Sequence, residues 1–128
     1  MMIDIDDFKK INDTHGHLTG DRVIRTFSKI LEDSIRTIDI LGRYGGDEFL
    51  LILPETIIDE ARVVAERIQK NLADYQQNVM GEFGILTASI GLVAFDDTCR
   101  TDKTIFLGKI DNILLAAKRA GKNKIIIG

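Results

Sequence analysis

The chain has 128 residues, a formal net charge of −3 and 45% hydrophobic residues, a composition typical of one globular domain with a single core. The acidic balance argues against a general nucleic-acid coat and against binding to a nucleic-acid polymer, although a small basic cluster could hold a nucleotide. The only cysteine, Cys99, excludes an internal disulfide and is expected to be an unpaired thiol in a loop. No apolar run reaches the ~18 residues that span a bilayer, and no signal peptide is evident, so we expect a cytoplasmic protein.

The first third of the chain predicts a strand followed by two helices. Residues 1–6, MMIDID, form the predicted strand, and residues 6–17 a short helix and turn that Asp6 or Asp7 could cap. A second helix is expected from Asp21 to about Ile35. Its apolar residues recur every three or four positions and so form one face: Val23, Ile24, Phe27, Ile30, Leu31 and Ile35.

The remaining segments continue to alternate between strands and helices. Residues 39–45 and 47–54 flank a glycine pair and predict a hairpin, and a helix follows from Thr56, its expected N-cap. Residues 84–95 predict a long strand, and residues 102–120 a last helix before a closing strand at 122–128. Helices, a hairpin and about five strands in this order predict a single α+β domain over residues 1–128, with a mixed, ferredoxin-like sheet.

Four acids are expected near one another. Asp4 and Asp6 end the first strand and share one of its faces, and Asp47 and Glu48 arrive beside Asp4 if the hairpin pairs with that strand. Three or four converging carboxylates repel one another unless they hold a hard cation such as Mg²⁺ or Mn²⁺. The alternative is a set of solvated turn acids with no ligand.

Other features favour phosphate binding. A helix N-terminus follows the acidic strand directly, where free N–H groups can receive a phosphate, and Lys118, Lys122 and Lys124 lie near the end of the last helix. The alternative for these lysines is an ordinary helix C-terminus with its cations and glycine cap. Neither a P-loop nor a dinucleotide-binding glycine motif is present.

The stretch RYGGDEF at residues 43–49 resembles the signature of the GGDEF-domain family, the bacterial diguanylate cyclases. Three other blocks resemble the family in the same order, and together they span nearly the whole chain: residues 4–21, 88–93 and 116–125. The family makes cyclic di-GMP from two GTP molecules and releases two pyrophosphates, on a fold similar to the palm of nucleotidyl cyclases and polymerases. The resemblance therefore implies a nucleotidyltransferase that works as a homodimer.

The resemblance also implies a metal site. Asp4 and Asp47 would bind Mg²⁺ or Mn²⁺, with help from the backbone carbonyl of Ile5 and from Glu48. Asp47 stands at the position that the family proposes as base for the attacking 3′-hydroxyl, so Asp47 and Glu48 are the expected catalytic residues.

Substrate contacts follow from the same resemblance. Asn12 and Asp21 would hydrogen-bond the guanine edge, and an acid there accepts from N–H groups that adenine lacks. Gly45 would let the nucleotide approach the backbone. The β- and γ-phosphates would be held by backbone N–H groups near two residues and by two side chains: Phe8, Lys9, Lys118 and Lys122. Lysine at position 122, where the family often has arginine, keeps the charge but loses the bidentate fork.

A regulatory site is also implied. Arg36 and Asp39 resemble the family's RxxD motif, where product binds and inhibits, and Arg67 stands at the place of a secondary arginine. The alternative is a helix-end arginine and a turn aspartate. His15 and His17 are expected to have turn roles without metal ligation.

The chain also departs from the family pattern. Family members usually begin further upstream with a helix that packs on the domain, and this helix is missing from the sequence. Ile110, Ile113 and Leu115 replace the preferred Ala, Ala and Tyr, which we interpret as packing changes. Two alternatives to an active cyclase therefore stay open: a non-catalytic module that binds GTP or cyclic di-GMP for signalling, and a structural fragment without activity.

Overall fold

The computed structural model describes residues 1–79, 86–95 and 102–128. The order of its elements agrees with the predicted order. The elements are β1 (Met2–Ile5), α1 (Phe8–His15), α2 (His17–Asp33), β2 (Ile40–Arg43), β3 (Glu48–Ile52), α3 (Ile58–Val79), β4 (Ala88–Leu92), α4 (Lys103–Arg119) and β5 (Ile125–Ile127).

The strands form one five-stranded mixed sheet in the order β2-β3-β1-β4-β5. β1 lies in the middle and pairs antiparallel with both β3 and β4, and β2 pairs antiparallel with β3. β5 runs parallel to β4, as its connection through α4 requires. The predicted α+β class, the mixed sheet and the hairpin beside the first strand are all confirmed.

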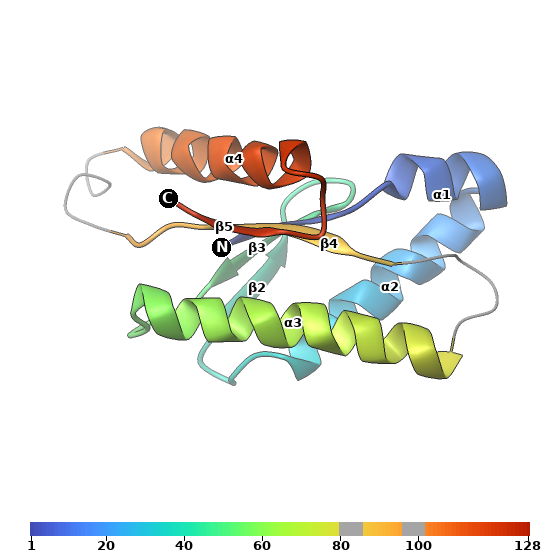
Figure 1. The fold of residues 1–128 in the computed structure, drawn as a ribbon, viewed down its shortest axis with the longest axis horizontal. Helices are drawn as coiled ribbons and strands as arrows, with labels where there is room; N and C mark the ends of the chain where they lie inside the picture. The colour runs from blue at the N-terminus through green and yellow to red at the C-terminus, as the bar shows by residue number, and fades with distance from the viewer. Residues whose placement is uncertain (80–85, 96–101) are drawn as a thin grey trace.

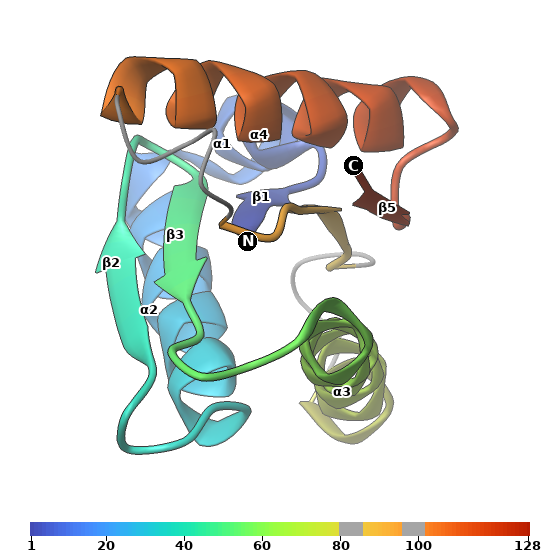
Figure 2. The same cartoon turned by 90° about the vertical axis from the view of Figure 1, so that its left-hand side faces the viewer.

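The sheet separates two helical layers. Figure 1 shows α4 on one side of it, with α2 and α3 on the other. Because side chains alternate along a strand, Ile3 and Ile5 join the larger core with α2 and α3, whereas Met2 packs with Ile110 and Leu114 beneath α4. Figure 2 shows the same layers from the side, with α4 running across the sheet.

The predicted helical faces are buried, but two helix starts differ from the predictions. In α2 the residues Val23, Ile24, Phe27, Ile30 and Leu31 are buried, as predicted. The helix begins at His17 rather than Asp21, because Gly16, at φ 84°, is enough to separate it from α1. α3 begins at Ile58, and the Thr56 hydroxyl donates to the Pro54 carbonyl.

Asp7 occupies the N-cap position of α1, one of the two predicted, but neither Asp6 nor Asp7 caps the helix with its side chain. Asp7 precedes α1 in a left-handed conformation, at φ 57°, and makes no side-chain hydrogen bond to the helix. Its carboxylate bonds to Lys122 instead, while the Asp6 carboxylate accepts from Thr87, Ser89 and the Asn123 backbone. Both acids therefore connect β1 to distant segments rather than cap α1.

The strand predicted over residues 84–95 is shorter than expected within the described part of the chain. β4 covers only Ala88–Leu92, and residues 84 and 85 lie outside the described residues. Cys99 lies outside them as well. None of the helices described is long and apolar enough to cross a membrane.

Candidate active site

The acidic turn, which joins β2 to β3 and carries Asp47 and Glu48, lies at the C-terminal end of β1 because β3 pairs with β1. Asp4 lies opposite Glu48 in the antiparallel ladder, and the Ile5 N–H donates to the Asp47 carbonyl at 3.1 Å. The two acids of the hairpin thus come next to an acid that precedes them by more than forty residues, as the sequence predicted.

Asp4 is a buried carboxylate with one cationic partner. It is only 4% exposed, and its Oδ2 accepts from Lys118 Nζ at 2.7 Å. Burial raises the pKa of Asp4 to about 6; the Lys118 ammonium opposes this rise, and the charges of Asp47 and Glu48 add to it. The negative charge at this point is therefore incompletely compensated.

The turn between β2 and β3 is held closed by Arg43. Its guanidinium donates to the carbonyls of Gly45 and Gly46, at 3.1 and 2.6 Å. The Tyr44 and Gly45 N–H groups both donate to the Glu48 carbonyl. A Cβ at Gly45 would lie 3.0 Å from the Glu48 carboxylate, so glycine allows this close approach. Arg43 is not among the site residues predicted from the sequence, although its place at the start of the signature was the available signal.

The two predicted phosphate lysines reach back to the acidic segment. Lys118 bonds to Asp4, and Lys122 bonds to Asp7 at 2.6 Å. The hydrogen bond to Lys122 lowers the pKa of Asp7, and the same bond raises the pKa of Lys122. Because Lys118 and Lys122 come from the last helix and the loop after it, the site is assembled from both ends of the chain.

The predicted convergence of three or four carboxylates is wrong for these side-chain positions. Among the described residues, no three histidine, cysteine, aspartate or glutamate side chains are gathered closely enough in these positions to form a ready-made metal site. The Asp4 oxygen is bonded to a lysine, and Asp6 turns to the hydroxyls of Thr87 and Ser89. The donors still suit a divalent cation, because Asp4 offers a hard carboxylate oxygen and the charges of Asp47 and Glu48 add to the negative charge there.

Asn12 and Asp21 lie on two helices that pack closely. A Cβ at Gly20 would come within 1.8 Å of Asn12 Oδ1, so glycine lets α2 lie directly against the Asn12 side chain. This oxygen is buried and has no hydrogen-bond partner among the described residues, whereas Asp21, the next residue along α2, is exposed. Phe8 and Lys9, in the first turn of α1, are half-buried and exposed respectively.

The RxxD residues form a compact corner after α2. The Arg36 N–H donates to Asp39 Oδ2 at 2.8 Å, and Asp39 Oδ1 is buried without a partner in the part of the chain that the structure describes. Arg67, from α3, donates to the Ser34 carbonyl at 2.8 Å, two residues before Arg36. The structure therefore brings Arg67 to the same corner, while the Arg36 side chain stays exposed.

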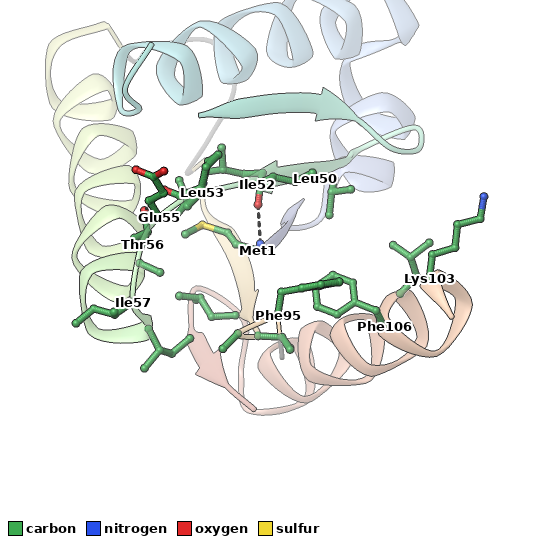
Figure 3. A pocket seen from close by; sticks show the side chains of 18 residues that line it. Met1, Leu50, Ile52, Leu53, Glu55, Thr56, Ile57, Phe95, Lys103 and Phe106 are labelled. Carbon is green, nitrogen blue, oxygen red and sulfur yellow. Dashed lines mark hydrogen bonds between the residues drawn. The ribbon is translucent and has the colours of Figure 1, made fainter. Parts of the chain in front are cut away.

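A large hollow lies at the opposite end of β1 from the acids. Figure 3 shows its lining, which includes Met1, Leu50, Ile52, Phe95 and Phe106, and its volume is about 980 Å³. It is mainly apolar and contains none of the predicted site residues. His15 and His17 are also remote from any cluster: they are exposed on either side of Gly16.

The fold and the acidic turn define a GGDEF domain. Residues 1–124 match the family described as "Diguanylate cyclase, GGDEF domain", and the chain belongs to that family. The resemblance seen in the four sequence blocks is thereby confirmed.

Individual relatives agree with this assignment. The chain is 39% identical over 133 residues to the probable diguanylate cyclase DgcT of Escherichia coli, covering 99% of this chain but 28% of that protein. A crystal structure of the diguanylate cyclase SiaD of Pseudomonas aeruginosa, in complex with its activator SiaC, matches with a TM-score of 0.89 and 36% identity, covering 99% of this chain and 48% of that one. The crystal structure of the GGDEF domain of DgcB from Caulobacter crescentus, in complex with c-di-GMP, matches with a TM-score of 0.88 and 29% identity. The match covers 98% of this chain and 74% of that one.

Proposed function

We propose that this chain is the catalytic domain of a diguanylate cyclase that condenses two GTP molecules into cyclic di-GMP and releases two pyrophosphates. One observation carries the proposal. The buried Asp4, the turn with Asp47 and Glu48, and Lys118 from α4 meet at one end of the sheet. A cluster that combines a buried carboxylate, two further acids and a lysine ammonium is suited to a nucleoside triphosphate bound with a divalent metal.

The reaction forms two phosphodiester bonds and breaks two phosphoanhydride bonds. Two protomers face each other, each with one GTP, so that each 3′-hydroxyl is in line with the α-phosphorus of the other GTP. Asp47 accepts the proton of the attacking hydroxyl, and pyrophosphate leaves with the electron pair of the broken bond. Asp4, Asp47, Glu48 and the Ile5 carbonyl would hold Mg²⁺ or Mn²⁺, which would supply charge neutralisation at the phosphates when bound.

The lysines have partners that they can exchange for substrate. Lys118 and Lys122 are held by Asp4 and Asp7, so both ammonium groups already lie at the site before a nucleotide arrives. Together with the N–H groups of Phe8 and Lys9, they bind the β- and γ-phosphates. Because Asp4 is also a proposed metal ligand, metal binding would release Lys118 for this task.

Specificity for guanine is assigned to Asn12 and Asp21. Asp21 is exposed on α2 and can accept from the guanine N1–H and N2–H, while Gly45 leaves room at the turn. The Asn12 amide oxygen lacks a donor, and rotation of the amide toward the ligand would give it one.

Product inhibition at a second site is part of the proposal. Arg36, Asp39 and Arg67 form the RxxD corner, in which Asp39 Oδ1 has no donor and the Arg36 guanidinium is exposed. Guanine N–H groups and phosphate oxygens match this pair. If Arg36→Ala binds cyclic di-GMP as tightly as the parent, the assignment is wrong.

The test is to incubate the purified chain with GTP and Mg²⁺ and to measure cyclic di-GMP by mass spectrometry over a range of protein concentrations. We expect product whose specific rate rises with concentration, because two protomers are needed, and none from Asp47→Ala. GTP binding without turnover would instead support a non-catalytic binding module, and full turnover by Asp47→Ala would contradict the catalytic assignment.

A further inference from the structure

We propose that Asp6 is a positioning residue that fixes the turn carrying Lys122, and that it thereby sets the affinity of the site for the β- and γ-phosphates. The inference rests on the proposed function. Asp6 is not a ligand in that proposal, and its carboxylate is bonded to three protein donors.

The contacts of Asp6 connect three separate segments. The side chain is 4% exposed, and its Oδ1 accepts from Ser89 Oγ at 2.6 Å. Its Oδ2 accepts from Thr87 Oγ1 at 2.7 Å and from the Asn123 N–H at 2.9 Å. β1, the start of β4 and the loop between α4 and β5 are therefore joined at one buried carboxylate, which is the strongest kind of acceptor.

The loop that Asp6 holds has a backbone that needs external support. Gly121, Lys122 and Asn123 have φ angles of 109°, 61° and 46°, so three consecutive residues are left-handed. Two of them carry side chains, for which this conformation is disfavoured and persists only where surrounding contacts impose it. The Asn123 N–H bond to Asp6 is such a contact.

The backbone on either side of Asn123 has bonds of its own. The Gly121 and Lys122 N–H groups donate to carbonyls of the last turn of α4 at 3.3 Å, and the Lys124 carbonyl accepts at 2.8 Å from β4. The remaining contacts of the Lys122 and Asn123 side chains are weaker than the bond from the Asn123 N–H to Asp6. Gln69 approaches the Asn123 side chain at 3.4 Å, and the bond from Lys122 to Asp7 lies at the exposed surface. Of the four non-glycine residues with positive φ in the described part of the chain, three are Asp7, Lys122 and Asn123, which surround Asp6. Without the Asp6 carboxylate the turn would relax, and the Lys122 ammonium would lose its fixed place beside Asp7.

The test compares a double variant that lacks both hydroxyl donors to Asp6 with a triple variant that also lacks the Asp6 carboxylate. The double variant Thr87→Val/Ser89→Ala removes the two hydroxyl donors but keeps the hydrogen bond from the Asn123 N–H to Asp6. The triple variant adds Asp6→Ala and removes that last bond as well. Because the hydroxyls are removed together with their acceptor, the triple variant avoids leaving them buried and unpaired, which favours folding. Asp6→Ala alone is the simpler third variant.

Two readouts are measured, the hydrogen exchange of the Asn123 amide and the affinities for GTP and GMP by calorimetry with Mg²⁺. We expect the double variant to keep the parent's amide protection and its ratio of GTP to GMP affinity. The triple variant should lose the protection and lower that ratio about tenfold, the size of one charge-assisted contact, with GMP affinity unchanged. A merely structural role for Asp6 would lower both affinities alike.

A folded triple variant that keeps the ratio or the amide protection would overturn the proposal. If neither variant lacking Asp6 folds, the exchange rate of the Asn123 amide in the parent decides: rapid exchange would overturn the inference, and slow exchange together with the double variant's unchanged ratio would support it. A parent chain that binds neither nucleotide would contradict the proposed function, and the exchange measurement would still show whether Asp6 holds the turn.

Discussion

The two ends of β1 bury charge in different ways. At the C-terminal end, Asp4 and Asp6 bond to side chains and backbone that follow them by 81 to 117 residues. At the N-terminal end, the Met1 ammonium is bonded to the Leu51 carbonyl at 2.7 Å and is otherwise surrounded by the apolar hollow. At the first end, charged and polar side chains from distant segments meet, and this end carries the proposed site. At the second end, apolar side chains line the hollow. We therefore expect substitutions at the first end to affect ligand binding, and substitutions at the second end to affect stability.

The largest expected effect is on the free energy of unfolding, and it should differ between a substitution at each end of β1. Leu51→Ala should lower the free energy of unfolding by about 3 kcal/mol, because Leu51 is completely buried and the change leaves a cavity. Asp47→Ala should change it by less than about 1 kcal/mol, since the Asp47 carbonyl that pairs with Ile5 remains. Urea denaturation measures both. If the two variants lose the same free energy of unfolding, the two ends of β1 do not differ in their contribution to stability as we expect.

A neutral isostere at Asp4 should stabilise the fold while it impairs the site. Burial raises the pKa of Asp4 to about 6, so the ionised carboxylate opposes folding at pH 8. We expect Asp4→Asn to raise the free energy of unfolding by about 1 kcal/mol at pH 8, and by nothing at pH 4, where much of the native Asp4 is already protonated. The loss of the Lys118 ion pair reduces the gain. A variant less stable than the parent at pH 8 would show that this ion pair outweighs the burial.

Stability should depend on pH in opposite directions because of the two ends. Asp4 keeps a proton in the folded state that the unfolded chain loses, so its contribution falls as pH rises from 3.8 to about 6. In the 128-residue chain produced by itself, the Met1 amine has a pKa lowered by burial from 8.0 to about 6, so the unfolded chain holds the extra proton and stability rises from pH 6 to 8. We expect these two groups to produce a minimum near pH 6 in denaturation curves. Acetylation of Met1 should remove only the increase in stability above pH 6. If that increase is unchanged in the acetylated chain, a group other than the Met1 amine causes it.

The smallest effect is expected at the exposed edge of the acidic end. Asp7 has φ 57°, a conformation that glycine adopts without strain. Asp7→Gly should therefore raise the melting temperature slightly, by the equivalent of about 0.5 kcal/mol, since the exposed bond to Lys122 adds little. Asp7→Ala, which keeps the strain and loses the same bond, is the matched control and should not stabilise.

The sequence predicted what depends on periodicity and missed what depends on long-range side-chain bonds. The apolar spacing of α2 identified its buried face, and the glycine pair identified the hairpin beside β1. The side-chain cap at Asp6 or Asp7 was mispredicted because local spacing cannot reveal that Thr87, Ser89 and Asn123 claim Asp6. The metal cluster was predicted from shared strand faces, which place the carboxylates near one another but do not show that Lys118 occupies Asp4.

The most direct test of the account is thermal unfolding of the parent and Asp4→Asn, each with and without GTP and Mg²⁺. Without ligand, we expect the melting temperature of Asp4→Asn to be higher than that of the parent. Saturating GTP and Mg²⁺ should raise the melting temperature of the parent by several degrees but leave that of Asp4→Asn nearly unchanged. The order of the two melting temperatures should then reverse. An equal increase in both proteins would contradict the claim that the charge buried at the end of β1 serves to bind the metal and nucleotide.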